Sequence, residues 1–163
     1  MAKMSRITEN IRELDLIDRQ ILNILSENAR EKLTTIARKV QLSMDSTKKR
    51  IQKMENSGLI TRYTIQVNPE RYGLPLAVHI YVKLKNITKE RLDAFFGDMK
   101  KNSRVIDLMS VLGDYDVYIV ILAKNTEDMD AIKTEIKQKF TDIIDDWKEV
   151  LVTRLYKLEE YRF

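Results

Sequence analysis

A short helical pattern, a two-residue turn and a longer basic helical pattern follow one another within residues 32–58, and this segment constrains the fold more than any other. Apolar side chains recur at helical spacing within residues 34–40, and residues 41 and 42 leave room only for a tight turn. Ser43 can cap the second helix, because its hydroxyl can accept from a backbone N–H that lacks a helical partner. Gly58 supplies a left-handed stop. The segment therefore predicts a helix-turn-helix.

The second of these helices has one apolar stripe and one polar stripe. Met44, Thr47, Ile51 and Met54 recur at intervals of three and four, so this stripe is expected to face a core. The opposite stripe carries Asp45, Ser46, Lys48, Lys49, Gln52 and Lys53. Contact with base edges and phosphates in a major groove needs such hydrogen-bonding and cationic side chains. A charged stripe can equally be a solvated face, and spacing alone favours neither reading.

The positive charge of the chain is concentrated in its first third. Residues 1–66 contain 13 lysines and arginines against 8 aspartates and glutamates, a net charge of +5. The remaining residues contain 16 against 17, and the whole chain has a net charge of +4 and a pI near 9.2. Neutralising phosphates supplies most non-specific affinity for DNA. A basic N-terminal module therefore fits double-stranded DNA better than a membrane or an acidic protein.

Length and composition limit the remaining classes. A chain of 163 residues with 44% hydrophobic content can form one medium domain or two small ones. It has no run of about 18 apolar residues that could span a membrane, and residues 1–13 lack the apolar core of a signal peptide. We expect a soluble cytoplasmic protein. Because the chain has no cysteine and His79 is its only histidine, we expect no disulfide, no metal site and no cofactor.

The hydrophobic period changes at the end of this first module. Residues 15–28 are strongly amphipathic with helical spacing, Asp15 is placed to cap that helix, and Asp18 adds favourable negative charge to its first turn. After Gly58 the period falls from 3.6 to 2, because apolar and polar side chains alternate over residues 62–67. This alternation predicts a half-buried strand.

Both prolines of the chain lie within residues 68–75 and mark a candidate domain boundary. Beyond it we expect strands at residues 78–85, 105–112, 117–123 and 147–158, and helices at residues 89–101 and from Thr126, as the cap, to Phe140. The order βαββαβ is the ferredoxin-like arrangement, and the whole chain is of the α+β class. We divide it into a helix-turn-helix domain (1–62), a linker strand or hinge (63–75) and a ferredoxin-like domain (76–163).

A ferredoxin-like sheet has one face covered by helices and one face open. The strands here offer more Ile, Val, Leu and Tyr than a single solvated face needs, so the open face is expected to pack on another copy. The predicted minimum unit is a homodimer. Its two recognition helices, about one helical turn of DNA apart, could meet a palindromic site.

Several short motifs, in a fixed order, resemble the Lrp/AsnC transcription regulators. Residues 14–22, Leu-Asp-Leu-Ile-Asp-Arg-Gln-Ile-Leu, look like the family's Leu-Asp-x-x-Asp-x-x-Ile-Leu opening. Further matches are Ala29-Arg30, Ile36-Ala37, Leu42-Ser43, Lys49-Arg50-Ile51, Gly58-Leu59-Ile60 with Tyr63, and Gly113-Asp114-Tyr115-Asp116. Each match is weak alone, whereas their order and spacing are specific. The resemblance extends from Leu14 to about Leu158.

The resemblance implies a winged or simple helix-turn-helix reader joined by a strand to a ferredoxin-like effector domain. It also implies dimers that commonly assemble into octamers, and an amino acid bound between subunits. The residues expected to contact DNA are Ser43, Asp45, Ser46, Lys48, Lys49, Arg50 and Lys53. Of these, Ser46 and Lys49 are expected nearest the bases. Asp45 could accept from a cytosine amino group or could favour the helix N-terminus.

The Gly113, Asp114, Tyr115 and Asp116 turn is the expected effector site. Its carboxylates and phenol could hold the ammonium group of an amino acid. From the residues alone a tight hairpin is the simpler explanation, because Gly and Asp are common turn residues, and only the resemblance favours an effector site. Residues 154–158 would line the same interface. The charged approach to the last strand, residues 142–149, has no Pro-Gly turn of the kind that many family members carry there.

Two other functions stand beside regulation. Sirohaem decarboxylases resemble this family in layout, but their chemistry needs cationic and imidazole groups around a tetrapyrrole, and a lone His79 among apolar neighbours fits a packing or surface role better. A protein that coats DNA with little sequence preference would use the same basic face as a reader. The sequence favours a DNA-binding regulator over both.

Overall fold

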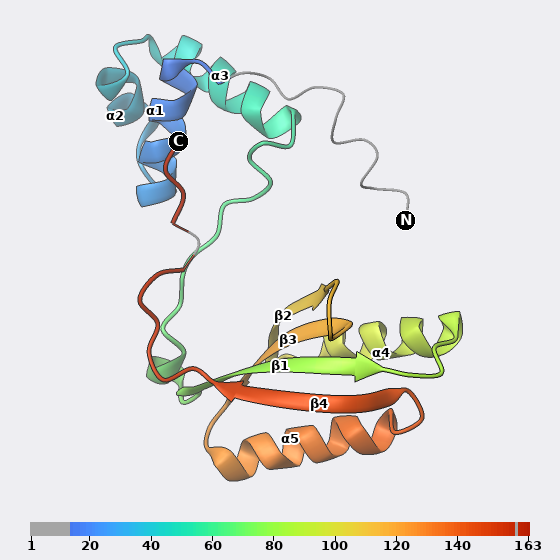
Figure 1. Ribbon diagram of the computed structural model, residues 1–163. Helices are drawn as coiled ribbons and strands as arrows, with labels where there is room; N and C mark the ends of the chain where they lie inside the picture. Colours follow the sequence, from blue (N-terminus) through green and yellow to red (C-terminus); the bar gives the residue numbers. More distant parts are fainter. Residues whose placement is uncertain (1–13, 159) are drawn as a thin grey trace. The chain divides into compact units, whose positions relative to one another are not determined.

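In the computed structural model, which describes residues 14–158 and 160–163, the chain divides into two compact units (Figure 1). The first extends to Gln66 and includes Lys157–Phe163, and the second is Val67–Tyr156. The division falls inside the predicted hinge of residues 63–75. No sequence pattern indicated that the C-terminal segment belongs with the first unit, where the Asn23 side chain bonds the backbone N–H and carbonyl of Phe163.

The first unit consists of three helices. These are α1 (Leu16–Glu27), α2 (Leu33–Lys39) and α3 (Met44–Asn56). Both predicted caps are confirmed, because the Asp15 and Ser43 side chains accept from the backbone N–H three residues later, over 2.8 and 3.1 Å. Gly58 has a φ of +74°, as its predicted role as a stop requires. The helix-turn-helix is therefore formed, and residues 61–67, as described, form no β-hairpin wing.

A small apolar cluster holds the three helices together. Its buried members are Ile21, Leu22, Ile36, Val40 and Met54. The predicted inward stripe of α3 is largely correct, and Thr47, which is fully buried, donates its hydroxyl to the Ser43 carbonyl oxygen over 2.9 Å. Met44 is the exception, because it is 52% exposed and takes no part in the cluster.

The strand predicted at residues 62–67 is wrong for the described chain. The segment has no strand pairing, and its apolar residues Tyr63, Ile65 and Val67 are exposed, Ile65 at 75%. The N–H and C=O groups of a strand must pair with a neighbouring strand. Alternation of apolar and polar side chains does not show whether such a neighbouring strand is present. A short 3-10 helix, η2 (Pro69–Tyr72), follows.

The second unit has a four-stranded antiparallel sheet of order β2-β3-β1-β4. Its elements are β1 (Leu76–Leu84), α4 (Lys89–Lys101), β2 (Val105–Ser110), β3 (Val117–Ala123), α5 (Thr126–Lys139) and β4 (Ile144–Leu151). This βαββαβ order confirms the predicted ferredoxin-like fold. Among the described residues, no helix is long and apolar enough to cross a membrane.

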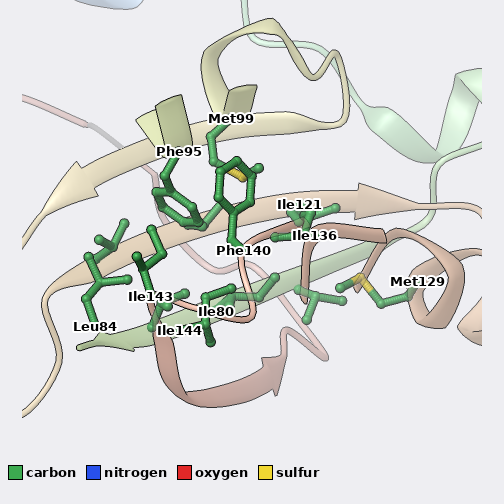
Figure 2. Close-up of a cluster of buried hydrophobic side chains, with 14 of the residues drawn as sticks. Ile80, Leu84, Phe95, Met99, Ile121, Met129, Ile136, Phe140, Ile143 and Ile144 are labelled. Carbon is green, nitrogen blue, oxygen red and sulfur yellow. The ribbon is translucent and has the colours of Figure 1, made fainter. Parts of the chain in front are cut away.

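One face of this sheet and both helices enclose the main core (Figure 2). Ile80 and its alternate neighbours along β1 are buried, as predicted from their period of 2. Phe95 from α4 meets Phe140 at the end of α5 edge to face, with ring centroids 5.1 Å apart. The alternate side chains of β1, among them His79 and Tyr81, are only partly buried and lie on the opposite face. That face is covered by no helix of this unit.

Two predicted boundaries in this unit need correction. The cap of α5 is Asn125, whose side chain accepts from Asp128 N–H over 2.8 Å, and Thr126 is the first helical residue instead. The last strand is shorter and earlier than residues 147–158. Its pairing with β1 ends where the Val152 N–H donates to the Ala77 carbonyl, because Pro75, just before β1, has no N–H to continue the ladder.

The turn between α2 and α3 contains a strained residue, Gln41, with a φ of +56°. We expect Gln41→Gly to raise the free energy of unfolding of the first unit by about 0.5–1 kcal/mol. The left-handed conformation costs about 1–2 kcal/mol for a residue that has a side chain, and glycine avoids this cost. The greater entropy of glycine in the unfolded chain offsets only part of that gain. Hydrogen exchange of the α2 and α3 amides measures the change. As a control, Gln52→Gly within α3 should lower stability by about 1 kcal/mol, and a fall for Gln41→Gly would contradict the argument.

Candidate DNA-binding and effector sites

The outer face of α3 carries the cations that the sequence predicted for DNA contact. Lys48, Lys49 and Lys53 are exposed, and none of them forms an ion pair with another residue in the part of the chain that the structure describes. The opposite face of α3 packs on the apolar cluster, which fixes the helix in place. The three ammonium groups therefore lie on the side of α3 that faces solvent. Such groups can neutralise phosphates without breaking a pair with any residue that the structure describes.

The N-terminal turn of α3 presents two hydroxyl groups and a carboxylate. The Ser43 hydroxyl accepts from the Ser46 N–H and donates to the Ser46 hydroxyl oxygen over 2.9 Å. Ser43 is therefore engaged as the cap, whereas the Ser46 hydroxyl keeps its own hydrogen for another acceptor. Asp45 is exposed in the first turn, where negative charge is favourable to the helix.

Arg50 differs from the lysines on α3. Its Nη1 lies 2.6 Å from Asp15 Oδ2 and 2.8 Å from Asp18 Oδ1, both at the start of α1. Its pKa is raised, first by the hydrogen bond to Asp15 and then by that to Asp18. Sequence analysis placed Arg50 with the DNA contacts and treated Asp18 only as a favourable charge in a helix turn. The contact of Arg50 with DNA stays a prediction.

The predicted effector turn connects β2 to β3. Gly113 has a φ of +154°, a value that favours glycine, and both Gly113 and Asp114 are exposed. Asp116 is engaged within the fold, because its Oδ2 accepts from the backbone N–H of Leu84 over 2.8 Å and lies 3.5 Å from Lys83 Nζ. Asp116 therefore has a structural role in the hairpin, whereas the carboxylate of Asp114 is exposed and is the one that could meet a ligand.

Tyr115 joins the turn to the sheet. Its hydroxyl donates to Asp146 Oδ2 on β4 over 3.1 Å, and its ring lies 5.8 Å from that of Tyr81 on β1. The pKa of Tyr115 is raised, mainly by desolvation and then by the bond to Asp146. Nearby on the same open face, the Tyr118 hydroxyl lies 2.7 Å from His79 Nδ1, a hydrogen bond. His79 thus has the packing role expected of a lone histidine.

Two hollows in the described chain do not include this turn. One of about 360 Å³ is lined by Ala29, Arg30 and residues 63–65. Another of about 270 Å³ lies between α5 and the ends of β1 and β4, with Met129 and Leu151 in its wall. Neither includes residues 113–116. No group of three or more His, Asp or Glu side chains suited to a metal ion is present among the described residues.

Comparison with known proteins assigns the chain to a family. Residues 14–55 match the AsnC-type helix-turn-helix domain, and residues 77–159 match the Lrp/AsnC ligand binding domain. The transcriptional regulator LrpA of Pyrococcus horikoshii is 34% identical over 124 residues, which cover 76% of this chain and 86% of that protein. This chain therefore belongs to the Lrp/AsnC family. It is a transcriptional regulator with a DNA-binding and a ligand-binding domain, and the decarboxylase alternative is set aside because the named relatives are transcriptional regulators.

Solved structures share the two-domain fold. An AsnC family transcriptional regulator from Agrobacterium tumefaciens has 26% sequence identity and a TM-score of 0.80, over 89% of this chain and 94% of that one. The regulator NMB0573 of Neisseria meningitidis, solved as a complex with L-Met, has 20% identity and a TM-score of 0.82, over 91% of this chain and 96% of that one. The second likeness concerns the fold alone.

The two aspartates of the turn should respond differently to substitution. We expect Asp116→Ala to lower the free energy of unfolding of the second unit by about 1–2 kcal/mol, because the Leu84 N–H loses its acceptor. Asp114→Ala, at an exposed position, should change it by less than about 0.5 kcal/mol. Urea unfolding of each variant measures both values. Equal losses would show that Asp114 also holds the turn.

Proposed function

We propose that this chain reads a specific DNA sequence with the outer face of α3 and that a small effector, an amino acid, changes this binding. Of the residues predicted to contact DNA, the proposal keeps Ser43, Asp45, Ser46, Lys48, Lys49 and Lys53 as contacts, and it sets Arg50 apart because its guanidinium is bonded to Asp15 and Asp18. The observation that carries the proposal is the exposed lysine face of a helix that is capped at Ser43 and packed at Met54. In this arrangement Lys48 and Lys53 hold phosphates, and Ser46 and Lys49 lie nearest the base edges.

A homodimer is part of the proposal. On the open face of the sheet, Met109 lies beside Tyr118 and Val150 lies beside His79. Met109 and Val150 are large apolar side chains that are exposed to solvent. Pairing of two such faces would remove apolar surface from water and place two readers on a palindromic site. Assembly of dimers into an octamer is an expectation that rests on the family resemblance.

The proposed effector site is the turn of Gly113, Asp114, Tyr115 and Asp116, completed by a neighbouring subunit. The Asp114 carboxylate is exposed and could receive an ammonium group. The turn stands at the surface and lines neither hollow described above, so a second subunit would be needed to enclose a ligand. The L-Met complex of the structurally similar NMB0573 supports an amino acid as the class of effector.

DNA binding can be tested by two lysine substitutions. We expect Lys53→Ala to weaken binding to all DNA alike and to reduce the slope of log affinity against log salt by about one, because one phosphate contact is lost. Lys49→Ala should relax preference at a single position of the site. Lys101→Ala on α4 removes the same charge elsewhere and is the control. Equal losses on every sequence from both α3 variants would contradict base reading and favour a DNA-coating protein.

Effector binding can be tested by calorimetry with individual amino acids. We expect one of them to bind the parent chain and to alter its affinity for its own upstream DNA. Asp114→Ala should weaken that ligand by about tenfold or more, the order of a lost charge-assisted hydrogen bond. Asp130→Ala, at the hollow beside α5, is the matched control. If Asp130→Ala alone weakened the ligand, the site would lie in that hollow and not at the turn.

A further inference from the structure

The guanidinium of Arg50 on α3 is bonded to the start of α1. Its Nη1 donates to Asp15 over 2.6 Å and to Asp18 over 2.8 Å. Only 29% of the Arg50 side chain is exposed, and Asp18 is fully buried. Hydrogen bonds between two ions are roughly twice as strong as neutral ones. These bonds join parts of the chain 35 and 32 residues apart, and they tie α3 to α1.

Asp15 has two tasks at once. Its Oδ1 accepts from the Asp18 N–H and caps α1, while its Oδ2 accepts from Arg50. The Asp18 N–H and then the Arg50 guanidinium hold the pKa of Asp15 below its usual value. One carboxylate therefore caps α1 and also helps to hold α3 against it.

We propose that Arg50 is a positioning residue for DNA reading, which fixes α3 on α1 through Asp15 and Asp18 and does not itself hold a phosphate. This inference rests on the proposed function. A phosphate would have to draw the guanidinium away from two carboxylates, and the buried Asp18 would lose part of the compensation for its charge. The exposed lysines of α3 can neutralise phosphates without that loss. The lysines thus supply affinity, and Arg50 supplies the geometry that brings Ser46 and Lys49 to the bases.

Asp15→Asn gives a sharp test, because the two possible roles of Arg50 predict opposite changes in DNA binding. A phosphate ligand predicts tighter binding, and a positioning residue predicts a loss of preference. Asparagine caps a helix as well as aspartate does, so α1 keeps its start. If Arg50 were a phosphate ligand held back by Asp15, the variant would bind all DNA more tightly. If Arg50 positions α3, preference for the chain's own upstream DNA over random DNA should fall roughly tenfold, because a displaced helix loses base contacts of about that worth. Glu27→Gln, at the far end of α1, removes the same charge and should leave the preference unchanged.

Arg50→Met is the second variant, because it removes the charge and keeps a long side chain. We expect its preference to fall as in Asp15→Asn while the slope of log affinity against log salt stays that of the parent. A lost phosphate contact would lower the slope by about one. Lys53→Met, with the same change of charge, should lower the slope by about one and keep the preference.

Tighter binding of Asp15→Asn to all DNA would overturn the inference, as would a lower slope with intact preference for Arg50→Met. Hydrogen exchange in α1 and α3 checks that both variants fold, and if Arg50→Met does not, Asp15→Asn decides alone. A parent chain with no preference for its upstream DNA would refute the proposed function, and the inference with it. If the parent chain prefers its upstream DNA and both variants keep that preference, the inference about Arg50 is refuted, but the proposed function is not.

Discussion

The packing of α3 on α1 is the constraint on which the proposed reading of DNA by this chain depends. A recognition helix must bury one face and present the other at a fixed angle. Burial of Thr47 and Met54 sets the depth of α3 in the apolar cluster, and the ion pairs of Arg50 tie it to the start of α1. The exposure of Lys48 and Lys49 then follows, because they project from the side of the helix that this packing leaves in solvent.

The sheet of the second unit has two unlike faces. One face is covered by the helices of the same chain, and the other face is left open. Apolar side chains from α4, α5 and the strands fill the covered side. On the open side, Tyr115 is bonded to Asp146 and touches Tyr81, so the turn and the sheet form one connected surface. In the proposed dimer, a ligand at the turn would act on the same surface that pairs the subunits. This gives a physical route from effector to dimer geometry, and so to the spacing of the two readers.

The elements that sequence analysis predicted well are those with local causes. Helical spacing and the side-chain caps of Asp15 and Ser43 depend on residues at most four positions apart, and the buried alternation of β1 fixes its register to the core. The strand expected at residues 62–67 and the long last strand failed, because a strand also needs a partner that no local pattern reveals. Arg50 shows the same limit in the candidate site: the family resemblance placed it with the lysines as a DNA contact, but the carboxylates that bind it lie at the start of another helix.

The most direct measurement of the central claim is a structure of the full chain bound to its own upstream DNA. The account predicts that the N-terminal half of α3 lies in the major groove, with Ser46 and Lys49 within hydrogen-bonding distance of base edges and Lys53 near a phosphate. Arg50 should remain on Asp15 and Asp18. An α3 outside the groove, or an Arg50 guanidinium that has left both carboxylates for a phosphate, would contradict the account.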